Sequence, residues 1–141
     1  MLRELAIFEK LEHQLVGTAD QLRDAIADPA GPDALVAQSP DGNLVGYALF
    51  FHNFSTFLCR RGLYLEDIYV RPEFRGLGIG KSMLRRLAEI AIERGCGRME
   101  WAVLDWNQNA IDVYRAIGGD VLPDWRIVRL GTDQIAKLSF N

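Results

Sequence analysis

Cysteine and histidine are scarce in this sequence, which limits the metal and redox chemistry that it can support. The 141 residues include two cysteines and two histidines. Cys59 and Cys96 lie far apart and match no zinc-binding or redox spacing. Because His13 and His52 are the only imidazoles, a histidine-rich metal site is not expected either. We therefore predict a protein without a bound metal.

A basic excess and a long apolar run are also missing. The chain carries 16 Lys and Arg residues against 19 Asp and Glu residues, a net charge of -3, whereas non-specific nucleic-acid binding requires a basic surface. No apolar run approaches the roughly 18 residues of a membrane-spanning helix. The N-terminus mixes apolar with charged side chains, unlike a signal peptide. Free thiols without an export signal predict a cytoplasmic protein. The net charge and the absence of a long apolar run predict that it has no nucleic-acid or membrane partner.

The pattern of apolar residues predicts one mixed α/β domain over residues 1–141. With 49% apolar residues, a chain of this length can bury a core. The clearest helix covers 78–94, and Gly95 ends it. Thr18 and Gln21 form a capping box before an earlier helix. The other predicted elements are a helix from Leu2 to Leu11 with a break at Gly17, strands at 34–38, 44–52, 63–70 and 99–103, a hairpin turn at 39–43, a loop at 60–62, a helix at 109–117, strands near Val121 and at 126–130, and a helix or strand at 132–140.

The segment RGLGIGKS, from Arg75 to Ser82, has three glycines at alternate positions and ends like a phosphate-binding loop. A P-loop would require glycine in place of Arg75, and it would follow its strand without the intervening residues 71–74. A dinucleotide-binding G-x-G-x-x-G motif would require glycine in place of Lys81 or Met83. Neither a nucleotide triphosphate nor a dinucleotide is therefore expected.

The motif that remains is Arg-x-x-Gly-x-Gly at the start of an amphipathic helix. Glycines let backbone N–H groups approach a ligand, and the N-terminus of a helix carries partial positive charge. This combination suits a pyrophosphate. The alternative is a plain strand-to-helix turn that needs flexible residues, but three glycines exceed what one turn requires, because each costs backbone entropy.

This motif resembles the R/Q-x-x-G-x-G/A sequence with which the GNAT superfamily of N-acetyltransferases binds the pyrophosphate of acetyl-CoA. Three blocks are similar to its diamine acetyltransferase branch, which includes spermidine/spermine and thialysine acetyltransferases: RELAIFEKLEHQ (3–14), LYLEDIYVRPEFRGLGIG (63–80) and AVLDWNQNAIDVYRAIGG (102–119). The resemblance implies a mixed, mostly antiparallel GNAT-type sheet flanked by helices. The chain begins inside the family's first helix, so we expect the strand that precedes that helix to be missing here; either the true start lies upstream, or this version leaves an open sheet edge.

The resemblance implies that acetyl-CoA is the co-substrate. The glycine segment would bind the pyrophosphate, and the backbones of Ile68 and Val70 would pair with the pantetheine as a peptide adds to a strand. Lys81, Arg85 and Arg86 could also reach phosphate oxygens, although an ordinary solvated helix face is an equal alternative. The CoA-binding residues that the resemblance implies are Ile68, Tyr69, Val70, Arg75, Gly76, Leu77, Gly78, Ile79, Gly80, Lys81, Asn107 and Tyr114.

Tyr114 and Glu66 match the family's catalytic positions. Tyr114 would protonate the leaving thiolate, because thiols titrate near 8.5 and tyrosine near 10; a core aromatic on a short helix is the alternative. Glu66 would accept the proton of the amine through water, and a solvent-facing side chain is the alternative. Asp67 points to the opposite face of its strand if that strand is regular. The backbone N–H of Ile68 would stabilise the oxyanion.

A small amine substrate is mostly protonated at neutral pH, so acidic residues are expected around it. Such a wall could be formed by Glu9 and Glu12 with the neighbouring pair Glu66 and Asp67. Trp125 matches a tryptophan in the family's late segment. Asn109 is interpreted as a plain helix cap, and the family implies a homodimer whose interface helps to build the amine sites.

The sequence therefore predicts an acetyl-CoA-dependent N-acetyltransferase that acts on a small primary amine such as thialysine, a lysine-like amino acid or a polyamine. One alternative is a protein or peptide N-acetyltransferase, but the chain has no extra peptide-binding insertion. Another is a non-catalytic acyl-CoA-binding domain, which would need neither Glu66 nor Tyr114. The sequence does not identify the physiological amine.

Overall fold

The computed structural model describes residues 1–140, which form two compact units. The first unit spans Met1–Leu104 and the second begins at Asp105. The prediction of a single domain over the whole chain therefore stays a prediction, and each unit is described by itself. No helix within the described residues has the length and apolarity needed to cross a membrane.

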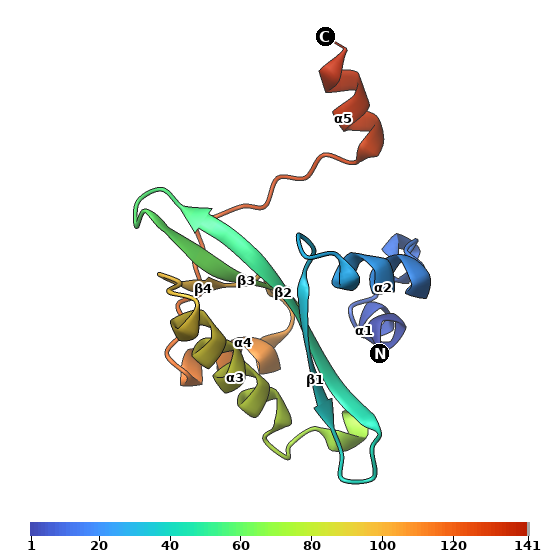
Figure 1. The fold of residues 1–141 in the computed structure, drawn as a ribbon, viewed down its shortest axis with the longest axis vertical. Helices are drawn as coiled ribbons and strands as arrows, with labels where there is room; N and C mark the ends of the chain where they lie inside the picture. Colours follow the sequence, from blue (N-terminus) through green and yellow to red (C-terminus); the bar gives the residue numbers. More distant parts are fainter. Residues whose placement is uncertain (141) are drawn as a thin grey trace. The chain divides into compact units, whose positions relative to one another are not determined.

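The first unit contains a four-stranded sheet between helices (Figure 1). The strands are β1 (Asp33–Gln38), β2 (Leu44–Ser55), β3 (Arg60–Val70) and β4 (Met99–Glu100), in the order β1-β2-β3-β4. The first two pairings are antiparallel and the last is parallel. The prediction of a mixed, mostly antiparallel sheet is confirmed. Helix α3 (Ile79–Glu93) lies on one side of the sheet, and α1 (Leu2–Phe8) and α2 (Ala19–Ala27) lie on the other.

The core is built where α3 meets the sheet. The buried side chains of α3 follow the helical period. Buried apolar residues of the strands face these α3 side chains, so the burial of apolar surface holds the helix against the sheet. Those side chains are Met83, Leu84, Leu87, Ile90 and Ala91 on α3, with Ala48, Phe50, Leu63 and Leu65 on β2 and β3.

Helix α1 is shorter than predicted, because the backbone leaves the helical conformation at Lys10. Lys10 has a φ of 61°, in the left-handed region. Its N–H donates to the carbonyl of Ile7, and the N–H of Leu11 donates to that of Ala6. These two bonds form a Schellman cap, which usually carries glycine at this position. A short 3-10 helix, η1 (Glu12–Gln14), follows, well before the break expected at Gly17.

The observed bounds of several strands also differ from the predicted ones. β3 begins at Arg60, so the expected loop at 60–62 is part of a strand, and β2 continues to Ser55 to pair with it. β4 has two residues where five were predicted. By contrast, the capping box of Thr18 and Gln21 before α2 is confirmed, as is the end of α3 at Gly95, which has a φ of 67°.

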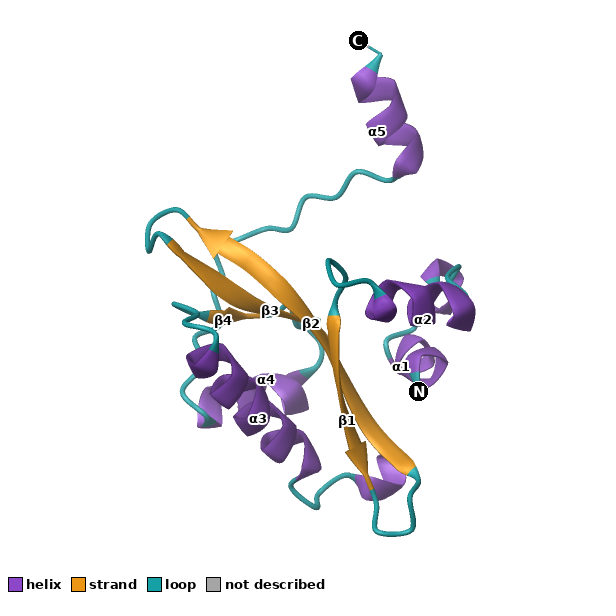
Figure 2. Cartoon of the chain, viewed as in Figure 1, coloured by secondary structure: helices purple, strands orange, loops and turns teal. Residues whose placement is uncertain are grey.

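The second unit contains α4 (Gln108–Ala116) and α5 (Thr132–Ser139), joined by a long loop (Figure 2). The two predicted strands near Val121 and at 126–130 are wrong for this structure. Their residues pair with no strand within the described chain, and an apolar segment without a partner cannot satisfy its backbone as a strand. The segment at 132–140, which the sequence left open, is a helix.

Candidate active site

The glycine segment forms the turn that enters α3, and two of its glycines have backbone angles that other residues rarely adopt. Gly76 has a φ of 78° and Gly78, the N-cap of α3, a φ of 79°. A Cβ atom at either position would meet no other atom within 4 Å. The space above both glycines is therefore open, as close approach of a pyrophosphate to the backbone requires. The chain thus fits the phosphate group that the motif implies.

Arg75, at the start of the motif, is bound within the protein. Its Nε donates to the carbonyl of Val70 at 2.9 Å. Its guanidinium carbon lies 4.9 Å from the ring centre of Phe8 and 5.4 Å from that of Tyr69. These contacts fix the turn against β3 and α1. The sequence motif gave no sign of this role, and a direct contact between Arg75 and coenzyme A stays a prediction.

The outer edge of β3 is open next to this turn. Parallel pairing with β4 ends at Tyr64, which pairs with Glu100. On the other side of β3, the Arg71 N–H donates to the Val45 carbonyl at 2.9 Å. Because hydrogen-bonded and non-hydrogen-bonded pairs alternate in an antiparallel ladder, the N–H groups of Ile68 and Val70 point away from β2. An extended ligand could therefore bond to β3 at these two positions.

A β-bulge places Glu66 beside this open edge. Leu49 of β2 opposes Asp67, whereas the next residue, Phe50, opposes Leu65, so Glu66 is the extra residue of β3. The bulge bends the strand, so β3 is not regular here and the condition for placing Glu66 and Asp67 on opposite faces is not met.

Asp67 belongs to an acidic cluster that faces α1, in which Asp67 and Glu9 are half-buried and Glu66 is exposed. The hydroxyl of Tyr47 lies 3.4 Å from the Asp67 carboxylate and donates to it. Burial first, and then the charge of Glu66, raises the pKa of Asp67 above its ordinary range, and the Tyr47 hydrogen bond partly opposes this. Burial and the charge of Asp67 raise the pKa of Glu9 at the end of α1. The cluster of Glu9, Glu66 and Asp67 would therefore be stabilised by a cation.

Tyr47 contacts this cluster through Asp67, and the sequence did not single it out. Burial, followed by the charge of Asp67, raises its pKa strongly, so it stays protonated as a hydrogen-bond donor. Its ring lies 6.4 Å from that of Tyr69, directly across the β2–β3 pair. The only sequence signal was a polar-tipped aromatic at an alternating position of an apolar strand, which also describes an ordinary half-buried tyrosine.

Other predicted site residues of the first unit lie on the surface. Glu12 is exposed in η1. Lys81 and Arg85 are exposed on α3, at its N-terminal half. Arg86 bonds at 3.0 Å to each of two glutamates on its own helix, Glu89 and Glu93, so part of the basic face is neutralised internally. The roles of these residues in binding stay predictions.

In the second unit, Asn107 is the N-cap of α4, and its side chain accepts from the Ala110 N–H at 3.4 Å. The interpretation of Asn109 as the cap is therefore wrong, because Asn109 lies inside the helix. Tyr114 is half-buried on α4, and Trp125, with 76% of its surface exposed, lies in the loop that follows. Their distances from the acidic cluster are not determined.

Comparison with known proteins identifies the family of this chain. The model of the "Acetyltransferase (GNAT) family" matches residues 1–118. The chain is 38% identical to the thialysine N-epsilon-acetyltransferase of Bos taurus over 99% of this chain and 88% of that protein. It is 41% identical to the L-ornithine N5-acetyltransferase of Arabidopsis thaliana over 80% of this chain and 50% of that one. An integron cassette protein of V. cholerae shares the fold, with a TM-score of 0.77 at 22% identity over 98% of this chain and 86% of that one.

The family model covers most of the chain, and four of the curated relatives match nearly all of it. Several of those relatives are thialysine N-epsilon-acetyltransferases, and a spermidine/spermine N(1)-acetyltransferase-like protein of Homo sapiens matches as well, at 34% identity. The chain therefore belongs to the GNAT family of N-acetyltransferases, in its diamine acetyltransferase branch.

Proposed function

We propose that this enzyme transfers the acetyl group of acetyl-CoA to a small primary amine. The observation that carries the proposal is that Glu9, at the end of α1, and the pair Glu66 and Asp67 bring negative charge to the segment of β3 whose outer edge is open to a ligand. The raised pKa values of Glu9 and Asp67 mean that the ionised forms of both carboxyl groups are disfavoured in the free protein. A bound ammonium group would stabilise these ionised forms. A plain acyl-CoA-binding domain would not need that arrangement.

Acetyl-CoA supplies the reactive thioester when it is bound. The backbone N–H groups around Gly76 and Gly78, at the positive end of α3, would hold the pyrophosphate. Ile68, Tyr69 and Val70 would hold the pantetheine along β3. The N–H of Ile68 would donate to the acetyl oxygen, where negative charge develops during transfer.

The amine must lose a proton before it can attack, because a lysine-like amine has a pKa near 10.4. Glu66 takes that proton through a water molecule. Asp67 and Glu9 stabilise the ammonium form on arrival, and Tyr47 keeps Asp67 in place through its hydrogen bond. Tyr114 protonates the leaving thiolate as general acid.

The relatives support an amino-acid or polyamine acceptor. Their names include thialysine and L-ornithine among the acetylated amines, and spermidine and spermine in one name. We extend the same choice to this enzyme: thialysine, a lysine-like amino acid or a polyamine. Trp125 and Glu12 are proposed as further contacts of the amine, and Lys81 and Asn107 of coenzyme A.

The enzyme is also proposed to work as a homodimer in the cytoplasm. The loop between α4 and α5 carries several exposed apolar side chains, which a second copy could cover. They are Leu122, Trp125, Ile127, Val128 and Leu130. Light scattering at micromolar concentration should show a dimer, and a monomer with full activity would contradict this part of the proposal.

The proposed activity is tested by acetyl-CoA-dependent thiol release with thialysine, lysine, spermidine, putrescine and a short peptide as acceptors. The proposal expects at least one small amine to be acetylated with a higher kcat/KM than the peptide. A peptide that exceeds all of the amines would favour a protein N-acetyltransferase. Tight acetyl-CoA binding without turnover on any acceptor would favour a binding domain.

A further inference from the structure

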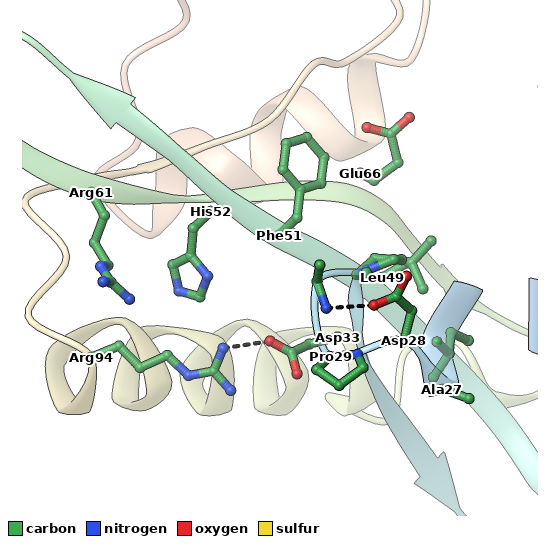
Figure 3. Close-up of a pocket in the computed structure, with 14 residues that line it drawn as sticks. Ala27, Asp28, Pro29, Asp33, Leu49, Phe51, His52, Arg61, Glu66 and Arg94 are labelled. Carbon is green, nitrogen blue, oxygen red and sulfur yellow. Dashed lines mark hydrogen bonds and ion pairs between the residues drawn. The ribbon is translucent and has the colours of Figure 1, made fainter. Parts of the chain in front are cut away.

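The first unit contains a groove that is lined in part by Glu66. It has a volume of about 1010 Å³ and runs past the end of β1, where β2 continues without an outer neighbour. The loop between α2 and β1 forms one wall, and Glu66 and Phe51 lie toward one end. At the other end, three basic groups gather, Arg61, His52 and Arg94 (Figure 3).

The three basic groups come from three different elements. His52 lies on β2, and Arg61 on β3 is its diagonal neighbour, because Leu63 opposes His52 directly and Arg61 is two residues away. Such neighbours lie about 7–8 Å apart on one face of a sheet. Arg94 follows the last turn of α3 and forms an ion pair with Asp33 at the start of β1. Figure 3 shows the imidazole beside the guanidinium group of Arg61, with that of Arg94 below it in the view.

Two of these groups have unused hydrogen-bonding capacity. The Nε2 atom of His52 is buried and has no hydrogen-bond partner within the described residues. A buried polar atom of this kind normally has a partner, which can be a ligand. The Arg61 side chain makes no hydrogen bond or ion pair to any residue between 1 and 140, whereas Arg94 uses one end of its guanidinium on Asp33.

The charge at this end of the groove fits a monoanion. Arg61 and Arg94 contribute two positive charges and Asp33 removes one. Burial, and then the charges of Arg94 and Arg61, lowers the pKa of His52, so the imidazole is neutral near pH 7 and can still donate one hydrogen bond. A planar carboxylate matches a guanidinium fork, and a dianionic phosphate would exceed the available charge.

We propose that Arg61, His52 and Arg94 form a binding site for the carboxylate of a small molecule with an aliphatic body. Arg61 binds the carboxylate through its guanidinium fork, and His52 Nε2 donates to the same group. Ile26, Pro29 and Leu49 line other parts of the same groove and suit the aliphatic part. The carboxylate can come from an amino-acid substrate or from a separate small acid, and the experiment below distinguishes the two.

The test measures the binding of pentanoate to the intact chain without acetyl-CoA at pH 7.5. Binding is monitored through the NMR resonances of the His52 ring. Pentanoate should shift these resonances in the wild type. Arg61→Gln should weaken binding at least tenfold, and Arg61→Lys, which keeps the charge but loses the fork, should weaken it less. Arg60→Gln is the matched control, since it removes the same charge from the neighbouring exposed position outside the groove, and it should bind like the wild type.

Competition then identifies the source of the carboxylate. If the substrate's own carboxylate fills the site, lysine displaces pentanoate and 1,5-diaminopentane does not. If a separate acid fills it, neither amine displaces pentanoate. Unchanged His52 resonances with pentanoate, or equal weakening by Arg61→Gln and Arg60→Gln, would overturn the proposal. None of these outcomes depends on acetyl transfer, so the proposed activity can fail or succeed independently.

Discussion

Two neighbouring glycines of the turn into α3 should respond to substitution in opposite directions. Gly78 has a φ of 79°, and Gly80, two residues later, lies in the first turn of the helix without a left-handed angle. An L-residue in the left-handed region costs about 1–2 kcal/mol, and a β-branched residue is a genuine outlier there. Gly78→Val should therefore reduce the free energy of unfolding by at least about 1–2 kcal/mol.

Gly80→Ala should have the reverse effect on stability. The added Cβ would meet only the Val70 side chain, at 3.8 Å, which is an ordinary contact distance. Alanine in place of glycine inside a helix stabilises by about 0.5–1 kcal/mol. The glycine motif also allows alanine at this position, so coenzyme A binding should change little.

Urea unfolding gives the two stabilities, and calorimetry gives the affinity for coenzyme A. Gly78→Val should weaken binding at least tenfold, about 1.4 kcal/mol, under conditions in which the variant is folded. Gly80→Ala serves as the matched control on the same turn. The reasoning fails if Gly78→Val binds coenzyme A like the wild type, or if Gly80→Ala is the less stable of the two variants.

Three further substitutions test other parts of the structure. Tyr114→Phe keeps the ring and removes the proposed acid, so kcat should fall by about 10²–10⁴-fold with little change in the KM for acetyl-CoA; a wild-type kcat refutes the assignment. Asp67 has a raised folded pKa, so its contribution to stability is present below its ordinary pKa of 3.8 and is lost as pH rises through the folded value. Asp67→Asn should therefore melt higher than the wild type near pH 7, with a difference that shrinks toward pH 3.8, and equal melting temperatures at pH 7 would contradict this. Lys10→Gly should stabilise by about 1 kcal/mol in urea unfolding, because Lys10 adopts a left-handed angle; a loss of stability would contradict the cap.

Local chemistry explains which parts of the fold could be predicted. The capping box at Thr18 and the glycine after α3 act within a few residues, so their signals are complete in the sequence. The cap at Lys10 could not be predicted, because lysine pays a conformational cost there that only its surroundings can offset. The strands near Val121 and at 126–130 had a suitable apolar pattern, but a strand also needs a neighbour, which pattern alone does not provide.

The candidate site shows the same division. The glycine turn was readable because its backbone angles demand glycine. The bulge at Glu66 was not, because it depends on the register between β2 and β3, and the regular alternation of the sequence predicted the opposite orientation. The internal contacts of Arg75 and the part played by Tyr47 depend on which segments meet across the sheet, and a single sequence does not specify this.

The pH dependence of acetyl transfer in a Glu66→Gln variant is the most direct test of the central claim. Thiol release from acetyl-CoA would be followed with the best amine acceptor, for the wild type and the variant, from pH 7 to pH 10. If Glu66 removes the proton of a bound ammonium group, the variant should be about 10²–10⁴-fold slower at pH 7. The deficit should shrink as pH approaches the amine's own pKa near 10.4, where solvent removes the proton. A variant as fast as the wild type at pH 7, or a wild type that releases no thiol with any amine, would contradict the account.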